Sequence, residues 1–196
     1  RSIMKEATML YLKNCHIIDE VSDYIDDILI DSGKIKLIGK AKITNYITEK
    51  NQEAQLPDLH VQTKLDILEL DLCNRLVMPA FVDLHFHMRN PGQEHKETLL
   101  SANKAAIKGG YTDLLGMANT NPVIDNKTLI TEIIEKNNSL GMTRLLQVSA
   151  VTKGLNGKAL VDFEENRKAT RFFSDDGKNI DDEQIMREAL LASKEH

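Results

Sequence analysis

The chain has 196 residues, 41% of them hydrophobic, and carries a formal net charge of −5. This composition can bury a sizeable core in one large or two small domains. The interspersed acidic and basic residues argue against a nucleic-acid-binding or anionic-membrane-binding surface. The two cysteines, Cys15 and Cys73, form no CxxC motif, and neither a signal peptide nor a long apolar span is visible. We therefore expect a cytoplasmic protein in a reducing compartment.

Residues 1–78 carry mostly strand signals and are predicted to form a small β module. The sequence Asp31-Ser32-Gly33 predicts a hairpin turn with its glycine at a positive φ. Residues 41–64 are rich in Asn, Gln, Lys and Thr, which is typical of a long surface excursion. Short apolar stretches favour strands at 9–12, 15–18, 27–30, 34–38 and 66–72.

From residue 79 the pattern changes to strands that alternate with helices. Four successive βα units indicate an α/β fold with a parallel sheet, whose ligands gather at the carboxyl ends of the strands. A complete (β/α)8 TIM-type barrel needs about 250 residues. Residues 79–196 are therefore expected to supply only its first half, with an unpaired edge strand. Strands are predicted from residue 79 and over 111–117, 144–152 and 170–174, and helices over 95–108, from Asn126, near 158–168 and from Asp181.

The stretch 83–87 (DLHFH) lies at the end of the first of these strands. Because side chains alternate along a strand, Asp83, His85 and His87 face one way. The two imidazoles are close enough to bind one zinc-like ion together, with Asp83 orienting its neighbours. The opposite face is apolar and is expected to pack under helices: Val82, Leu84 and Phe86.

Other polar residues follow the strand ends, and each allows two interpretations. Arg89 is either a solvated loop arginine or a bidentate clamp for a substrate carboxylate. Asn119 is either an ordinary turn residue or part of a site at the end of a strand. Asp175 and Asp176 precede a glycine and suit a turn, but a carboxylate there could instead bridge two metals. Alternation does not decide which of the two would face the site.

Several motifs together carry a resemblance to a known family. The chain closely resembles the dihydroorotases of the amidohydrolase superfamily, and the resemblance covers nearly all of it. The HxHxR-x-PG run combined with the Asn-Thr-x-Pro turn is specific, whereas HxH alone would indicate only the superfamily. The motifs are PAFVDLHFHMRNPG at 79–92, KET at 96–98, AA at 105–106, KGGYT at 108–112, MANTNP at 117–122 and FSDDG at 173–177.

The resemblance implies a (β/α)8 barrel with a zinc (Zn2+) centre, usually of two ions. His85 and His87 would ligate the more buried metal, and Asp176 would take the place that a carboxylated lysine holds in other branches. Arg89 and Asn119 would hold the substrate carboxylate. The remaining metal histidines and the catalytic aspartate would lie beyond residue 196, so we expect the 196 residues alone to be inactive. Asn90 and Ala118 depart from the commonest family pattern, and we expect altered loop rigidity there.

The implied reaction is the reversible cyclisation of N-carbamoyl-L-aspartate to L-dihydroorotate in pyrimidine biosynthesis. Its partner is this small-molecule substrate, without nucleic acid or membrane, and a homodimer is compatible with the sequence. One alternative is a hydantoinase, dihydropyrimidinase or allantoinase, whose substrates lack the carboxylate. Another is a non-catalytic, truncated homologue that acts as a scaffold.

Overall fold

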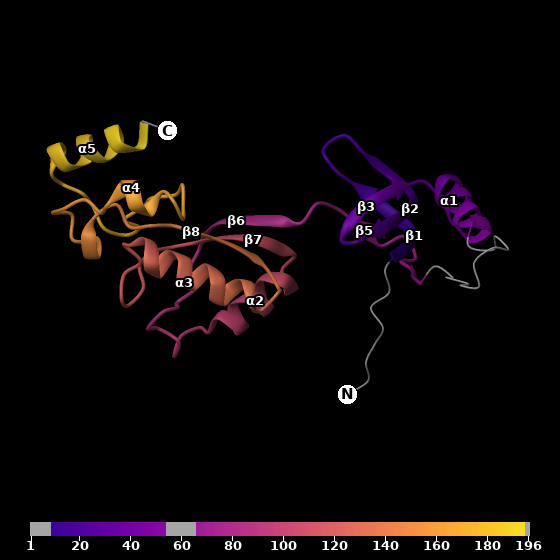
Figure 1. Ribbon diagram of the computed structural model, residues 1–196, viewed down its shortest axis with the longest axis horizontal. Helices are drawn as coiled ribbons and strands as arrows, with labels where there is room; N and C mark the ends of the chain where they lie inside the picture. Colours follow the sequence, from indigo (N-terminus) through magenta and orange to yellow (C-terminus); the bar gives the residue numbers. More distant parts are fainter. Residues whose placement is uncertain (1–8, 54–65, 195–196) are drawn as a thin grey trace. The chain divides into compact units, whose positions relative to one another are not determined.

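A computed structural model describes residues 9–53 and 66–194 of the chain (Figure 1). The chain divides into two compact units, Arg1–Pro79 and Ala80–His196. The first is mainly a β-sheet, and the second is a mixed α/β structure. In the described ranges, every helix is too short or too polar to cross a membrane.

The first unit is built on one sheet with strand order β3-β2-β1-β4, in which β5 also pairs with β1. The β1–β2 and β2–β3 pairs are antiparallel, whereas β4 and β5 run parallel to β1. The predicted hairpin joins β2 to β3, and both Ser32 and Gly33 have positive φ, as a tight two-residue turn requires. The strands are β1 (Met9–Ile18), β2 (Asp23–Asp31), β3 (Lys34–Ile38), β4 (Ile67–Asp71) and β5 (Leu76–Val77).

The predicted surface excursion is wrong over its first half, because residues 40–53 form helix α1 (Lys40–Glu53). One face of this helix packs on the sheet through apolar side chains spaced three and four residues apart. The many polar residues around them masked this stripe in the sequence. The rest of the predicted excursion, 54–64, lies outside the described residues. The packing side chains are Ile43, Tyr46 and Ile47.

The second unit contains a parallel three-stranded sheet of order β6-β7-β8, formed by Phe81–Phe86, Tyr111–Gly116 and Arg144–Gln147. Helices α2 (Leu99–Lys108) and α3 (Lys127–Asn138) follow β6 and β7 and run alongside the sheet (Figure 1). Their apolar faces share one core with the strands. The hydroxyl of Thr98 and the side chain of Asn126 cap the two helices, so α2 begins four residues later than predicted.

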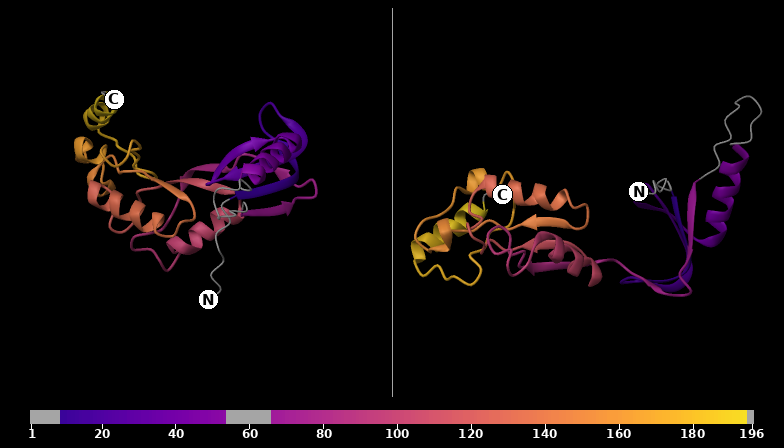
Figure 2. Two further views of the ribbon diagram at one scale, coloured as in Figure 1. Left: turned by 45° about the vertical axis from the view of Figure 1, so that its right-hand side comes forward. Right: turned by 90° about the horizontal axis from the view of Figure 1, so that it is seen from below.

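The last part of the second unit has little regular structure apart from short helices. These are η1 (Lys153–Leu155), α4 (Phe163–Asn166) and α5 (Glu183–Lys194). Figure 2 shows α5 at the same end of the unit as α4, with α2 toward the other end. The predicted strand 170–174 is reduced to a single parallel bridge between Ser149 and Phe173. Two backbone hydrogen bonds, from Ser149 to Phe172 and from Ser174 to Ser149, still hold this segment beside the chain that follows β8.

The apolar face of β6 differs from its prediction. Phe86 packs against the core, but Val82 and Leu84 are 53% and 71% exposed. The reason is their position at the sheet edge, since β6 pairs with β7 on one side and with no other strand among the described residues. Polar and apolar side chains thus alternate along β6, but of its three apolar side chains on the face predicted to be buried only Phe86 packs against the core.

Candidate metal centre

Three of the residues singled out in the sequence lie together at the carboxyl end of the sheet. His85 lies at the end of β6 and His87 directly after it, and Asp176 belongs to the segment that follows the Phe173 bridge. His85 Nε2 lies 3.3 Å from Asp176 Oδ1, and His87 Nε2 lies 3.7 Å from Asp176 Oδ2. The two imidazole rings meet edge to face, with centroids 5.1 Å apart. One nitrogen or oxygen from each side chain can therefore face a common point.

This arrangement fits a divalent metal ion. Metal–ligand bonds of about 2.1 Å in a tetrahedral shell place neighbouring ligand atoms about 3.4 Å apart. The candidate ligand atoms of the three residues all lie within 4.8 Å of one another, and the two distances above lie close to the tetrahedral value. Two imidazoles and a carboxylate are donors that zinc and similar ions accept in proteins. The side chain of His85 is 57% exposed, which leaves room for further ligands.

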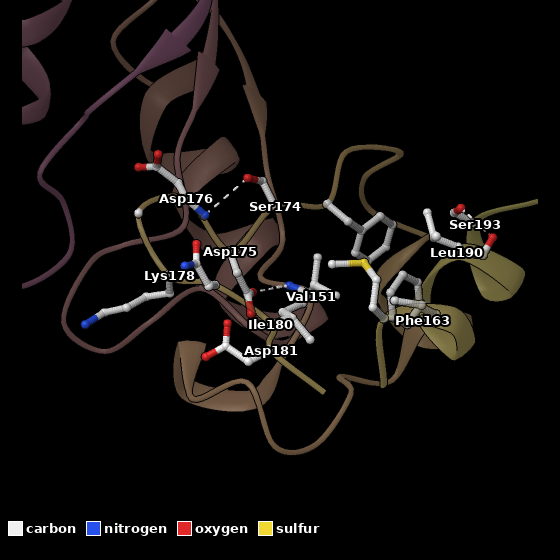
Figure 3. A pocket seen from close by; sticks show the side chains of 15 residues that line it. Val151, Phe163, Ser174, Asp175, Asp176, Lys178, Ile180, Asp181, Leu190 and Ser193 are labelled. Atoms are coloured by element: carbon white, nitrogen blue, oxygen red, sulfur yellow. Dashed lines mark hydrogen bonds between the residues drawn. The ribbon is translucent and has the colours of Figure 1, made fainter. Parts of the chain in front are cut away.

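The structure separates the roles of the two adjacent aspartates, which spacing alone could not. Asp175 is buried and accepts hydrogen bonds from the backbone N–H groups of Val151, at 2.7 Å, and Thr152, at 3.0 Å. It also accepts one from the Thr152 hydroxyl. Figure 3 shows the carboxylates of Asp175 and Asp176 pointing in opposite directions. Asp175 thus ties this turn to the loop after β8, and only Asp176 turns toward the histidines.

Asn119 occupies the gap between two of the candidate ligands. Its Oδ1 lies 3.0 Å from His87 Nδ1, and its Nδ2 donates to Asp176 Oδ2 at 2.8 Å. Its backbone carbonyl in turn accepts a hydrogen bond from Gln93 Nε2 at 3.0 Å. The loops after β6 and β7 therefore meet at this asparagine. Asn119 was among the residues predicted for the site, but Gln93 was not, because nothing in the local sequence pattern shows which loop glutamine turns back toward a neighbouring strand.

Arg89 stands just past the end of β6 with a left-handed backbone, φ +58°. Its carbonyl accepts a hydrogen bond from the N–H of Gln93, which closes the loop. Among the described residues its guanidinium has no hydrogen-bond or ion-pair partner. The side chain is only half-buried, so the five N–H donors of Arg89 remain available to an anion.

A further pocket of about 650 Å³ opens beside the two aspartates (Figure 3). Its walls come from the 173–181 segment, α4 and α5. Apolar side chains line much of it, among them Phe163, Met186 and Leu190.

The chain shares its fold with part of a solved cyclic-amide hydrolase structure. It is similar to the L-hydantoinase (dihydropyrimidinase) from Arthrobacter aurescens, with a TM-score of 0.58 and 20% identity, over 84% of this chain and 32% of that one. The family then follows from sequence. The model of the dihydro-orotase-like family matches residues 74–195, and the chain belongs to this family.

Curated relatives agree with the family model. The dihydroorotase of Aquifex aeolicus (strain VF5) is 36% identical over 189 residues, which are 94% of this chain and 40% of the relative. The dihydroorotase of Sulfurihydrogenibium sp. (strain YO3AOP1) is 37% identical over 185 residues, 93% of this chain and 39% of the relative. The chain thus spans about two fifths of the length of these relatives.

Proposed function

We propose that this chain carries the first part of a dihydroorotase, which interconverts N-carbamoyl-L-aspartate and L-dihydroorotate with the help of zinc. The observation that supports it most is the convergence of His85, His87 and Asp176 in a chain of the dihydro-orotase-like family. A histidine pair alone would suit many metal enzymes. Arg89 follows His87 by two residues, and its guanidinium, unpartnered among the described residues, would add a site for a substrate carboxylate.

We further propose that the second unit is the first part of a (β/α)8 barrel. Strands β6, β7 and β8 would be its first three strands, and the segment at the Phe173 bridge would take the position of the fourth. Residues outside the 196 would supply the rest. The parallel order β6-β7-β8 and the likeness to the L-hydantoinase support this arrangement. In such a barrel the catalytic groups lie at the carboxyl ends of the strands, which is where the three candidate ligands meet.

In this proposal His85 and His87 would hold zinc through their imidazoles, and Asp176 would hold it through its carboxylate. Zinc bound there would supply a nucleophile from water near neutral pH and polarise the ring amide. The chain's own residues position the substrate. The guanidinium of Arg89 pairs with the substrate carboxylate and fixes the ring relative to the histidines. The carboxylate that carries the proton to the departing nitrogen would lie beyond residue 196.

Asn119 can assist Arg89 without leaving its present contacts. An amide nitrogen has two N–H donors, and Asp176 uses one of them. The second can point to the substrate carboxylate. Arg89 and Asn119, from the loops after β6 and β7, would then both donate hydrogen bonds to the substrate carboxylate.

The test is hydrolysis of L-dihydroorotate by the full-length protein, compared with uncharged rings such as hydantoin and dihydrouracil. We expect turnover of dihydroorotate only. His85→Ala should lose about 10³-fold or more in kcat/KM, because a metal ligand is gone. Arg89→Ala should lose about 10²-fold through loss of a charge-assisted pair of hydrogen bonds.

Arg171→Ala is the matched control, since Arg171 is exposed and has no partner among the described residues. It should behave as the wild type does. Preference for uncharged rings would identify a hydantoinase-like enzyme and overturn the role of Arg89. Absence of any turnover with stoichiometric zinc would leave a non-catalytic homologue.

A further inference from the structure

We infer that Asn119 is a positioning residue for the metal centre, in addition to any contact with substrate. Its side chain fixes the hydrogen of His87 and the orientation of Asp176 at the same time. The inference rests on the metal role proposed for these two residues, but it concerns zinc binding rather than the reaction catalysed.

The chemistry of the partners determines which atom of Asn119 faces which ligand. An ionised carboxylate can only accept hydrogen bonds, so the amide nitrogen must be the atom that meets Asp176, at 2.8 Å. The amide oxygen is then the atom that meets His87 Nδ1, at 3.0 Å. An oxygen of this kind can only accept, so His87 must carry a hydrogen on Nδ1.

That hydrogen decides which nitrogen of His87 can bind a metal. In the neutral ring, a hydrogen on Nδ1 leaves the lone pair on Nε2. Nε2 is the nitrogen that lies 3.7 Å from Asp176, on the side of the candidate centre. Asn119 therefore selects the tautomer of His87 that can ligate there and holds its ring in the ligating orientation.

The same amide holds the third candidate ligand. Asp176 Oδ2 receives the N–H of Asn119, while Oδ1 faces His85 at 3.3 Å. The backbone N–H of Asp176 bonds to the Ser174 hydroxyl at 3.2 Å, and Asp175 anchors the turn from the opposite side. The carboxylate thus has one oxygen engaged by Asn119 and the other free for a metal.

Asn119 is itself held in place from two directions. Gln93 donates to its carbonyl at 3.0 Å, and the N–H of the second residue after it, Asn121, donates to the carbonyl of Pro91 at 3.1 Å. Both contacts come from the loop that follows the two histidines. The loop that follows β6 and the loop that carries Asn119 are therefore joined at Asn119 itself and again two residues after it.

Zinc affinity separates this role from substrate binding. We would measure the zinc dissociation constant of the full-length protein by competition with a chromogenic chelator, for the wild type, Asn119→Ala, Asn119→Asp and Arg89→Ala. Removal of an outer partner of a metal ligand weakens binding by about 10- to 100-fold. We expect a loss of that size for Asn119→Ala. We expect Arg89→Ala to bind zinc within about twofold of the wild type, because its guanidinium contacts none of the candidate ligands.

Asn119→Asp provides a second, nearly isosteric variant should the alanine variant fail to fold. It keeps an acceptor for His87 but removes the donor to Asp176, so His87 should keep its hydrogen on Nδ1 while Asp176 loses the hydrogen bond that orients it. The tautomer is read directly from 15N–1H spectra of the metal-free protein labelled on histidine, at a pH where the ring is neutral. His87 should carry its hydrogen on Nδ1 in the wild type and populate both tautomers in Asn119→Ala.

Zinc binding of a folded Asn119→Ala variant within twofold of the wild type would overturn the inference, as would a wild-type His87 with its hydrogen on Nε2. The outcome is independent of the proposed reaction. A protein whose zinc affinity depends on Asn119 but that leaves dihydroorotate intact would refute the proposed function and support the inference. An Asn119→Ala variant that binds zinc normally but has a raised KM for dihydroorotate would support the proposed function and refute the inference.

Discussion

At the scale of single residues, the first unit contains a buried carboxylate whose two oxygens are both used. Asp27 is 3% exposed. The hydroxyl of Tyr11 donates to its Oδ2 at 2.7 Å, and the N–H of Asn14 donates to its Oδ1 at 2.8 Å. Burial raises the pKa of Tyr11, and the hydrogen bond to Asp27 raises it further. The phenol therefore keeps its proton, and remains a donor, at pH values where an unburied tyrosine already ionises.

Replacing Tyr11 by phenylalanine removes one hydrogen bond from the buried carboxylate. The expected cost is about 1–3 kcal/mol in the free energy of unfolding, measured by denaturant titration at pH 7. Tyr24→Phe is the control, because Tyr24 is 42% exposed and its hydroxyl has no hydrogen-bond partner among the described residues. It should change stability by less than about 0.5 kcal/mol.

The same pair predicts a pH dependence. The phenol loses its proton near pH 10 in the unfolded chain but keeps it in the folded one, so its contribution to stability declines as pH rises above about 10. The difference between wild type and Tyr11→Phe should therefore shrink above that pH. A difference that stays constant to pH 11 would contradict this account of Tyr11.

At the scale of elements, the centre depends on how closely the loops after β6 and β7 approach each other. Gly92 has φ +82°, and a Cβ built on it would lie 1.7 Å from the backbone oxygen of Asn121. No side chain can occupy that space without moving one of the two loops. The glycine therefore permits the contact that places Asn119 beside His87.

Gly92→Ala should lower the free energy of unfolding by about 3 kcal/mol or more and weaken zinc binding as well. Gly141→Ala separates the two causes, since Gly141 also has a positive φ, +61°, but nothing lies within 4 Å of its Cβ position. It should cost about 1–2 kcal/mol from the backbone conformation alone and leave zinc affinity unchanged. Equal effects of the two substitutions on zinc affinity would show that loop contact is not what positions the site.

At the scale of the whole chain, features that depend on adjacent residues were predicted correctly, whereas features that depend on contacts between distant segments were not. The hairpin at Ser32–Gly33 and the cap at Asn126 are local, and both are confirmed. Helix α1 was missed because its segment is mostly polar, and its three apolar residues are recognisable as a buried face only when the sheet they pack against is known. The strand at 170–174 was overpredicted because its pairing depends on a neighbour rather than on its own residues.

The candidate site shows the same division. The alternation of His85 and His87 placed both imidazoles at one strand end, and a resemblance to a known family pointed to Asp176. The choice between Asp175 and Asp176, and the contacts of Asn119 and Gln93, require distances between loops far apart in sequence. No periodicity within one segment encodes those distances.

The measurement that tests the metal centre most directly is X-ray diffraction from crystals of the full-length protein grown with zinc, recorded on both sides of the zinc absorption edge. We expect an anomalous peak about 2.0–2.2 Å from His85 Nε2, His87 Nε2 and one carboxylate oxygen of Asp176. Zinc bound only elsewhere, or no peak within bonding distance of the histidine pair, would contradict the account.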